Sequence, residues 1–139
     1  MASSKSAIVY ADGGSRGNPG PSGAGALVKD KGGAGATIGE VNKFLGVNTN
    51  NFAEYTGLII GLEKALELGV DDVEVRMDSE LIVKQMLGQY RVKNQNLKPL
   101  YETAKGLSRR FSQFHIVHVE RALNKEADKL ANQAMDRGQ

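Results

Sequence analysis

Apolar residues occur in short runs along the first third of the chain. Residues 7–11 form one run, and residues 24–28 and 36–47 form two more on either side of a glycine-rich turn at 31–33. Short apolar segments bounded by glycine and polar residues are typical of β-strands joined by turns. The pattern therefore predicts three consecutive antiparallel strands.

Helical spacing replaces this pattern between residues 51 and 68. The apolar side chains there are Tyr55, Leu58, Ile59, Leu62 and Leu66. Their spacing places them on one face of a helix, and Gly69 is suited to end it. This is the clearest helix in the sequence.

The second half of the chain alternates strands with helices. Residues 73–77 alternate apolar and charged side chains, as a half-buried strand does. Cap and stop signals then predict a helix from 78–79 to Gly88, a basic helix at 97–111, a strand at 114–119 and a helix at 124–136. A strand that returns through a helical crossover runs parallel to its predecessor. We therefore predict one α/β domain over residues 1–139, with a mixed sheet and helices packed on its faces.

Composition limits the chemistry that this domain can perform. The chain has no cysteine and only two histidines, His115 and His118, which excludes thiolate catalysis and cysteine-ligated metal sites. Any metal ion must therefore be held by carboxylates. No apolar run approaches the roughly 18 residues of a membrane span, and the first residues lack the apolar segment of a signal peptide, so we expect a cytoplasmic protein. We also expect a monomer.

The net charge is only +2, but positive charge is concentrated in the second half of the chain. Residues 84–125 contain nine lysines and arginines against two acids. Such a segment is either a solvated helical face or a surface that contacts nucleic-acid phosphates, and composition leaves both interpretations open. If it binds phosphates, we expect Lys84, Arg91 and Lys93 to contribute most.

Four acids stand near the ends of predicted elements. Asp12 ends the first strand, Glu54 lies in the first turn of the first helix, Asp78 ends the fourth strand and Asp128 lies near the start of the last helix. An acid in such a position is often a helix cap or an exposed charge. Converging carboxylates without a basic partner would raise one another's pKa unless divalent cations held them ionised, and oxygen ligands select hard ions such as Mg²⁺ or Mn²⁺.

Polar and small residues accompany two of these acids. They are Gly13, Gly14 and Asn18 after Asp12, and Thr49, Asn50 and Asn51 before Glu54. Glycines allow a backbone to approach a ligand closely, and a helix N-terminus favours an anion. The pattern indicates a binding site, although a glycine-rich loop alone is a weak signal.

Four motifs in sequence order resemble the type 1 ribonucleases H, over residues 8–134. They are YADGG with GNPGP within 10–21, TNN with a glutamate at 49–54, MDS at 77–79 and NKEADKLA at 124–131. The resemblance implies the ribonuclease H-like fold. In this fold, three antiparallel strands and then two parallel ones form a five-stranded mixed sheet flanked by helices.

The resemblance also implies an endoribonuclease that hydrolyses the RNA strand of RNA/DNA hybrids and leaves 5′-phosphate and 3′-hydroxyl ends. Two divalent cations, Mg²⁺ or Mn²⁺, would be held by the catalytic acids Asp12, Glu54, Asp78 and Asp128. The substrate contacts would be Gly13, Gly14, Asn18, Asn50 and Asn51, together with Thr49 on a phosphate of the DNA strand.

The chain departs from this family in two places. Many members carry a histidine in the loop before the last helix, but here that loop is short, so we expect His118 to stay in the strand and Arg121 to contact the substrate instead. Residues 87–98 lack the long basic protrusion of some members, and we expect no separate hybrid-binding domain at the N-terminus. We therefore expect a compact form whose hybrid binding weakens with salt. The resemblance leaves open whether double-stranded RNA is also cut.

Two competing functions remain open. A transposase, integrase or resolvase domain would use a similar fold and acids on DNA, although the motif at 49–51 and the fourth acid argue against it. A catalytically silent nucleic-acid-binding module is the other alternative, and it would not need four intact acids.

Overall fold

The structure is a computed structural model that describes residues 5–32 and 35–138. Its elements are β1 (Ser6–Ser15), β2 (Gly20–Asp30), β3 (Thr37–Asn48), α1 (Asn50–Glu67), β4 (Asp72–Met77), α2 (Glu80–Met86), α3 (Lys98–Ser108), β5 (Gln113–His118), the 3₁₀ turn η1 (Arg121–Leu123) and α4 (Lys125–Arg137). The predicted order of strands and helices is confirmed. Part of the predicted turn at 31–33, Gly33, lies outside the described residues. No helix in the described part of the chain is long and apolar enough to cross a membrane.

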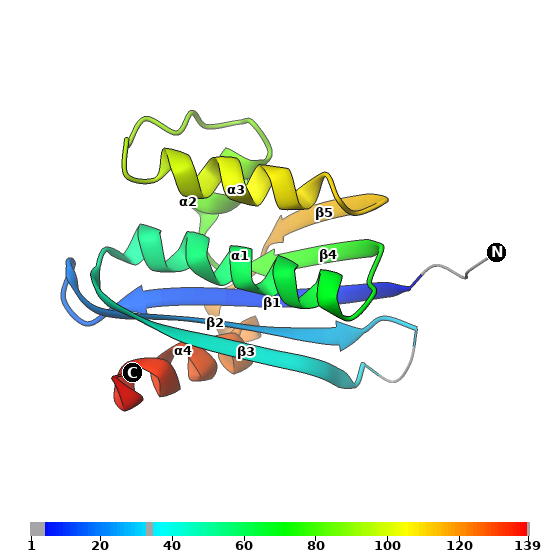
Figure 1. Ribbon diagram of the computed structural model, residues 1–139, viewed down its shortest axis with the longest axis horizontal. Coiled ribbons are helices and arrows are strands. Elements are labelled where there is room, and N and C mark those ends of the chain that lie inside the picture. The colour runs from blue at the N-terminus through cyan, green and yellow to red at the C-terminus, as the bar shows by residue number, and fades with distance from the viewer. Residues whose placement is uncertain (1–4, 33–34, 139) are drawn as a thin grey trace.

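The strands form one mixed sheet in the order β3-β2-β1-β4-β5 (Figure 1). β2 pairs antiparallel with both β1 and β3, whereas β1 with β4 and β4 with β5 are parallel. At the centre, Val9 lies opposite Val28 on one side and Val75 on the other. The predicted sheet of three antiparallel and then two parallel strands is confirmed.

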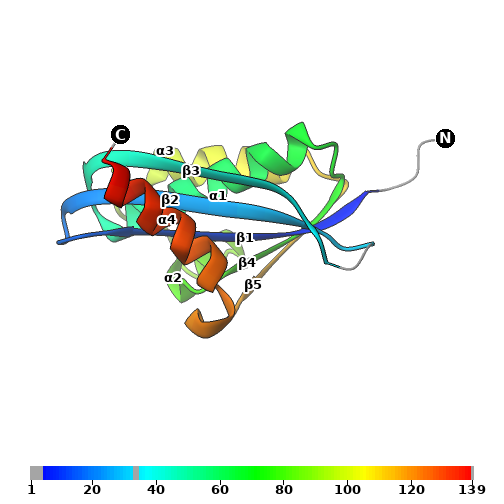
Figure 2. The same ribbon diagram turned by 90° about the horizontal axis from the view of Figure 1, so that it is seen from below.

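Helices α1, α2 and α3 cover one face of the sheet, and α4 crosses the other face over β1, β2 and β3 (Figures 1 and 2). The main core lies under the first three helices and includes the fully buried Leu58, Leu62 and Val75. On the opposite face α4 packs through small residues. A Cβ added to Gly25 of β2 would lie 2.6 Å from the backbone nitrogen of Ala131, so the missing side chain is what lets α4 come this close.

Two helix starts are fixed by side-chain caps. The hydroxyl of Thr49 accepts a hydrogen bond from the N–H of Phe52 at 3.2 Å, and that of Ser79 accepts one from the N–H of Ile82 at 3.3 Å. Because α1 begins at Asn50, Glu54 lies at the start of its second turn and not in its first turn as predicted. The caps fix the backbone next to Glu54 and Asp78.

Strand β1 is longer than predicted, and Asp12 does not end it. The strand continues to Ser15 and stays paired with β2 as far as Ser22, whereas its parallel pairing with β4 stops at Tyr10 and Arg76. Residues 13–15 lack the apolar side chains by which strands are recognised in a sequence, yet their backbone is hydrogen-bonded. Asp12 therefore lies where β1 and β4 have just separated.

Candidate active site

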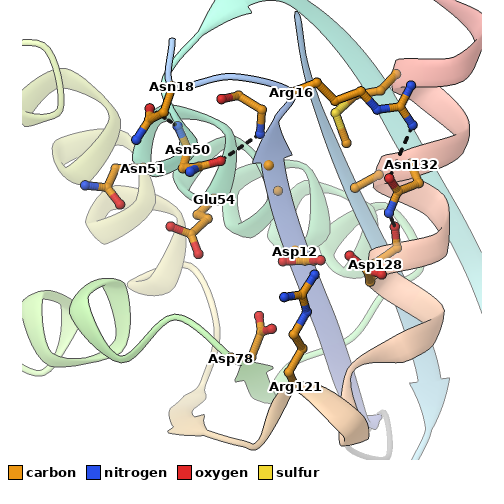
Figure 3. Close-up of a pocket in the computed structure, with 15 residues that line it drawn as sticks. Asp12, Arg16, Asn18, Asn50, Asn51, Glu54, Asp78, Arg121, Asp128 and Asn132 are labelled. Carbon is orange, nitrogen blue, oxygen red and sulfur yellow. Dashed lines mark hydrogen bonds between the residues drawn. The ribbon is translucent and has the colours of Figure 1, made fainter. Parts of the chain in front are cut away.

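The four predicted acids come together at the end of the sheet where β1 and β4 separate (Figure 3). Asp12 lies in β1, Asp78 directly follows β4, Glu54 projects from α1 and Asp128 from the first turn of α4. All four line one cavity of about 650 Å³. Residues that are far apart in the sequence thus form one acidic site.

Asp12 is the most buried of the four acids, with only 7% of its surface exposed. Burial is the largest cause that raises its pKa from 3.8 to about 8, followed by the negative charge of Asp78 and a hydrogen bond with the side chain of Asp128. The backbone N–H of Gly13 acts in the opposite direction by stabilising the carboxylate. Without a bound cation, burial and the neighbouring acids thus favour the protonated form of Asp12.

Glu54 is perturbed in the same way but less strongly. Burial, and then the charge of Asp78, raise its pKa from 4.5 to about 7, while a hydrogen bond from Ser79 lowers it. Two carboxyls with raised pKa values in one cavity are typical of a functional site.

Basic side chains do not neutralise this charge. In the described part of the chain, no lysine or arginine lies within 4.0 Å of the four carboxylates. Within the same residues, no group of three or more His, Cys, Asp or Glu side chains is arranged to hold a metal ion by itself. The donors therefore fit a hard cation that takes one or two carboxylates and completes its shell with water or phosphate oxygens, as Mg²⁺ does.

Three asparagines line the same cavity beside Glu54: Asn18, Asn50 and Asn51. The Oδ1 of Asn50 accepts the N–H of Ser15 at 2.7 Å, and the Oδ1 of Asn18 accepts the N–H of Asn50 at 3.1 Å. Because a backbone N–H must meet an oxygen, these bonds fix the orientation of both amides. Their NH₂ groups remain as hydrogen-bond donors toward the cavity.

The other predicted contacts divide into two groups. Gly13, Gly14 and Arg121 line the cavity, and the side chain of Arg121 extends from η1 toward the acids (Figure 3). Thr49, which caps α1, is not part of the lining, and neither is His118, which lies opposite Met77 in β5. The structure thus brings an arginine, and not a histidine, into the acidic site.

The comparisons with known proteins agree with this geometry. A family model described as "Reverse transcriptase-like" matches residues 10–134. Ribonuclease HI of Halobacterium salinarum is 44% identical over 128 residues, which are 92% of this chain and 63% of that protein. The chain belongs to the ribonuclease H family. The residues matched by the family model include all four acids.

Solved ribonuclease H structures are similar over almost their whole length. The N-terminal RNase H domain of rv2228c from Mycobacterium tuberculosis superposes with a TM-score of 0.93 at 45% identity, covering 97% of this chain and 96% of that chain. LC11-RNase H1, solved in complex with an RNA/DNA hybrid, gives a TM-score of 0.87 at 42% identity, covering 94% and 97%. The curated Bifunctional protein Rv2228c is 46% identical over 129 residues, and this chain spans only 35% of its length. Ribonucleases H generally depend on divalent metal ions.

Three residues at this candidate site were given no role from the sequence, although Asn124 begins the motif at 124–131. Arg16 lines the cavity and forms a 2.6 Å ion pair with Asp136. Asn132, one turn after Asp128, donates to its backbone carbonyl at 2.9 Å. Asn124 is buried behind the acids and is described below. Their contacts are long-range or depend on the α4 register, so local pattern does not reveal them.

The predicted phosphate contacts lie away from the acidic cavity. Lys84 is on α2 with its Nζ 5.0 Å from the ring centroid of Tyr90. Arg91 lines a second cavity of about 680 Å³, which is formed by α3 and the segment that connects α2 to α3. Lys93 is exposed in the same connection. A role of these three residues in hybrid binding stays a prediction.

Proposed function

We propose that this domain is an endoribonuclease that hydrolyses the RNA strand of RNA/DNA hybrids. In this proposal Asp12, Glu54, Asp78 and Asp128 hold two divalent cations, Mg²⁺ or Mn²⁺, and the products carry 5′-phosphate and 3′-hydroxyl ends. The observation that carries the proposal is the buried carboxyl group of Asp12, which lies among other acids and has no lysine or arginine of the described residues within 4.0 Å. Divalent cations in such a site supply Lewis-acid activation of water and neutralise charge at the scissile phosphate.

The polar side chains that line the cavity favour an RNA strand as the substrate. The free NH₂ groups of Asn18 and Asn50 can donate to 2′-hydroxyl and base-edge oxygens of a nucleic-acid minor groove. Amides can contact these atoms without requiring one base sequence. The hydroxyl of Thr49 accepts the capping bond through its oxygen, so its proton remains available for a phosphate of the other strand.

The proposed function is tested with matched RNA/DNA, RNA/RNA and DNA/DNA duplexes, each with and without Mg²⁺. We expect Mg²⁺-dependent cutting of the RNA strand in the hybrid, with 5′-phosphate ends found by end-labelling, because the cavity combines the acids with donors for a 2′-hydroxyl. Comparable cutting of the DNA duplex would favour a DNA nuclease on the same fold. If the protein bound the hybrid but did not cleave it, the domain would instead be a catalytically silent nucleic-acid-binding module. The reaction with the RNA/RNA duplex shows whether double-stranded RNA is also cut.

Arg121 is proposed to stabilise the departing phosphate in place of the loop histidine. Arg121→Ala should lower kcat by about 10- to 100-fold, because a charge-assisted hydrogen bond is worth roughly 1.5–3 kcal/mol. His118→Ala should stay within about twofold, since His118 does not line the cavity. Single-turnover rates of both variants on one hybrid are the measurement. A large loss in His118→Ala with folding and hybrid affinity intact, beside an active Arg121→Ala, would restore the histidine to the mechanism.

The cytoplasmic location and the monomeric state stay predictions. Because the chain covers only part of the curated relatives, the proposed activity is that of the domain.

A further inference from the structure

Asn124 is a buried amide at the junction of three elements that carry the acids. It precedes α4, has 1% of its surface exposed and has its backbone carbonyl bonded to the N–H of Asp128 at 3.1 Å. Its side-chain Nδ2 donates to the carbonyl of Ala11 at 2.9 Å and to the Oδ1 of Asp78 at 3.3 Å. Asn124 thus contacts the residue before Asp12, the carboxylate of Asp78 and the backbone of Asp128.

The orientation of this amide is determined by its neighbours. Ala11 and Asp78 both present acceptors, so only the NH₂ group can face them. The opposite atom, Oδ1, is buried and has no hydrogen-bond donor among the described residues. A buried acceptor without a partner is unfavourable. This unfavourable burial of the Oδ1 occurs at the position where the amide NH₂ group links β1 to Asp78.

We propose that Asn124 is a positioning residue that sets the separation of Asp12 and Asp78 for cation binding. This inference rests on the proposed function, because it concerns the same acids. An amide suits the task because it donates two hydrogens without carrying a charge. A lysine or arginine in its place would neutralise Asp78 and compete with the cations, and a purely apolar residue would leave the Ala11 carbonyl and the Asp78 oxygen without a donor.

The inference is tested by measuring Mn²⁺ binding to Asn124→Ala by titration calorimetry, together with kcat and KM on an RNA/DNA hybrid. Loss of a residue that orients metal ligands should weaken Mn²⁺ binding and lower kcat, each by about tenfold or more. The KM should change little, since Asn124 does not line the cavity. Asn124→Ser can donate to only one of the two acceptors, so its values should lie between those of the wild type and Asn124→Ala. Asn124→Ser also provides the measurement if Asn124→Ala does not fold.

The matched control is Tyr55→Phe. It removes another buried hydrogen bond, from the Tyr55 hydroxyl to the Oε1 of Gln85 at 2.6 Å between α1 and α2. If Asn124 acts only through stability, both variants should melt earlier and both should bind Mn²⁺ as the wild type does. That result would overturn the inference and leave the proposed function intact. A wild-type protein that neither binds Mn²⁺ nor cleaves the hybrid would instead reject the proposed function and this inference with it.

Discussion

Asp12→Asn should reduce Mg²⁺-dependent cleavage by about a thousandfold or more, and Asp78→Asn should do the same. Asp12 lies between Asp78 and Asp128 in the cavity, so its amide variant removes the charge that both cations would share. Rates on an RNA/DNA hybrid, with circular dichroism to verify folding, are the measurement. Glu63→Gln, an exposed carboxylate on the same helix as Glu54, is the matched control and should cleave normally. Retention of more than about a tenth of wild-type activity by Asp12→Asn would reject the assignment.

The same substitution should stabilise the metal-free protein at pH 8. Asp12 has a pKa of about 8 in the folded chain and 3.8 as its ordinary value, so the folded state binds this proton more tightly than the unfolded state. This stabilisation is complete below pH 3.8 and is lost as the pH rises toward 8. Asp12→Asn should remove that dependence, so in the presence of a chelator the variant should be more stable than the wild type at pH 8. Urea unfolding at pH 5 and pH 8 measures it. An equal loss of stability with pH in both proteins would contradict the expected burial of Asp12.

The sequence predicts most of this fold because its elements are amphipathic and clearly separated. The stripe of α1, from Tyr55 to Leu66, and the alternation in β4 correspond to buried faces in the structure. The four acids were found by the motifs that they share with a known family. The proximity of Asp12 and Asp78 follows from the parallel pairing of β1 with β4, which the order of elements already implies.

Prediction from the sequence fails where backbone contacts determine the structure. Residues 13–15 read as a loop, but they extend β1 because their N–H and C=O groups pair with β2. The glycine at 13 was interpreted as room for a ligand. A Cβ there would also lie 2.6 Å from the backbone nitrogen of Glu54, so its absence admits α1 as well. Asn124 bonds to Ala11 across 113 positions, and no local pattern carries such a contact.

Gly57→Ala should be the most damaging single-methyl change in the helices near the site. Gly57 lies in the interior of α1, and an added Cβ would collide with the backbone carbonyl oxygen of Asp12 and lie 3.0 Å from its carbonyl carbon. Replacing glycine by alanine inside a helix ordinarily gains up to about 1 kcal/mol. Here the opposing atoms are backbone atoms of a central strand and cannot rotate away. The overpacking should therefore outweigh that gain and destabilise the protein by roughly 3 kcal/mol.

The substitution should also impair metal binding and cleavage. The added methyl group must displace α1, which carries Glu54, from β1, which carries Asp12. We expect Gly57→Ala to bind Mn²⁺ more weakly and cleave more slowly even at temperatures where it remains folded. Gly106→Ala is the matched control: Gly106 lies within α3, nothing stands within 4 Å of its added Cβ, and the same substitution there should stabilise the protein slightly. Unfolding midpoints and calorimetric Mn²⁺ titrations of the two variants separate these outcomes. If Gly57→Ala gained stability as Gly106→Ala does, the close packing of α1 on β1 at Asp12 would be wrong.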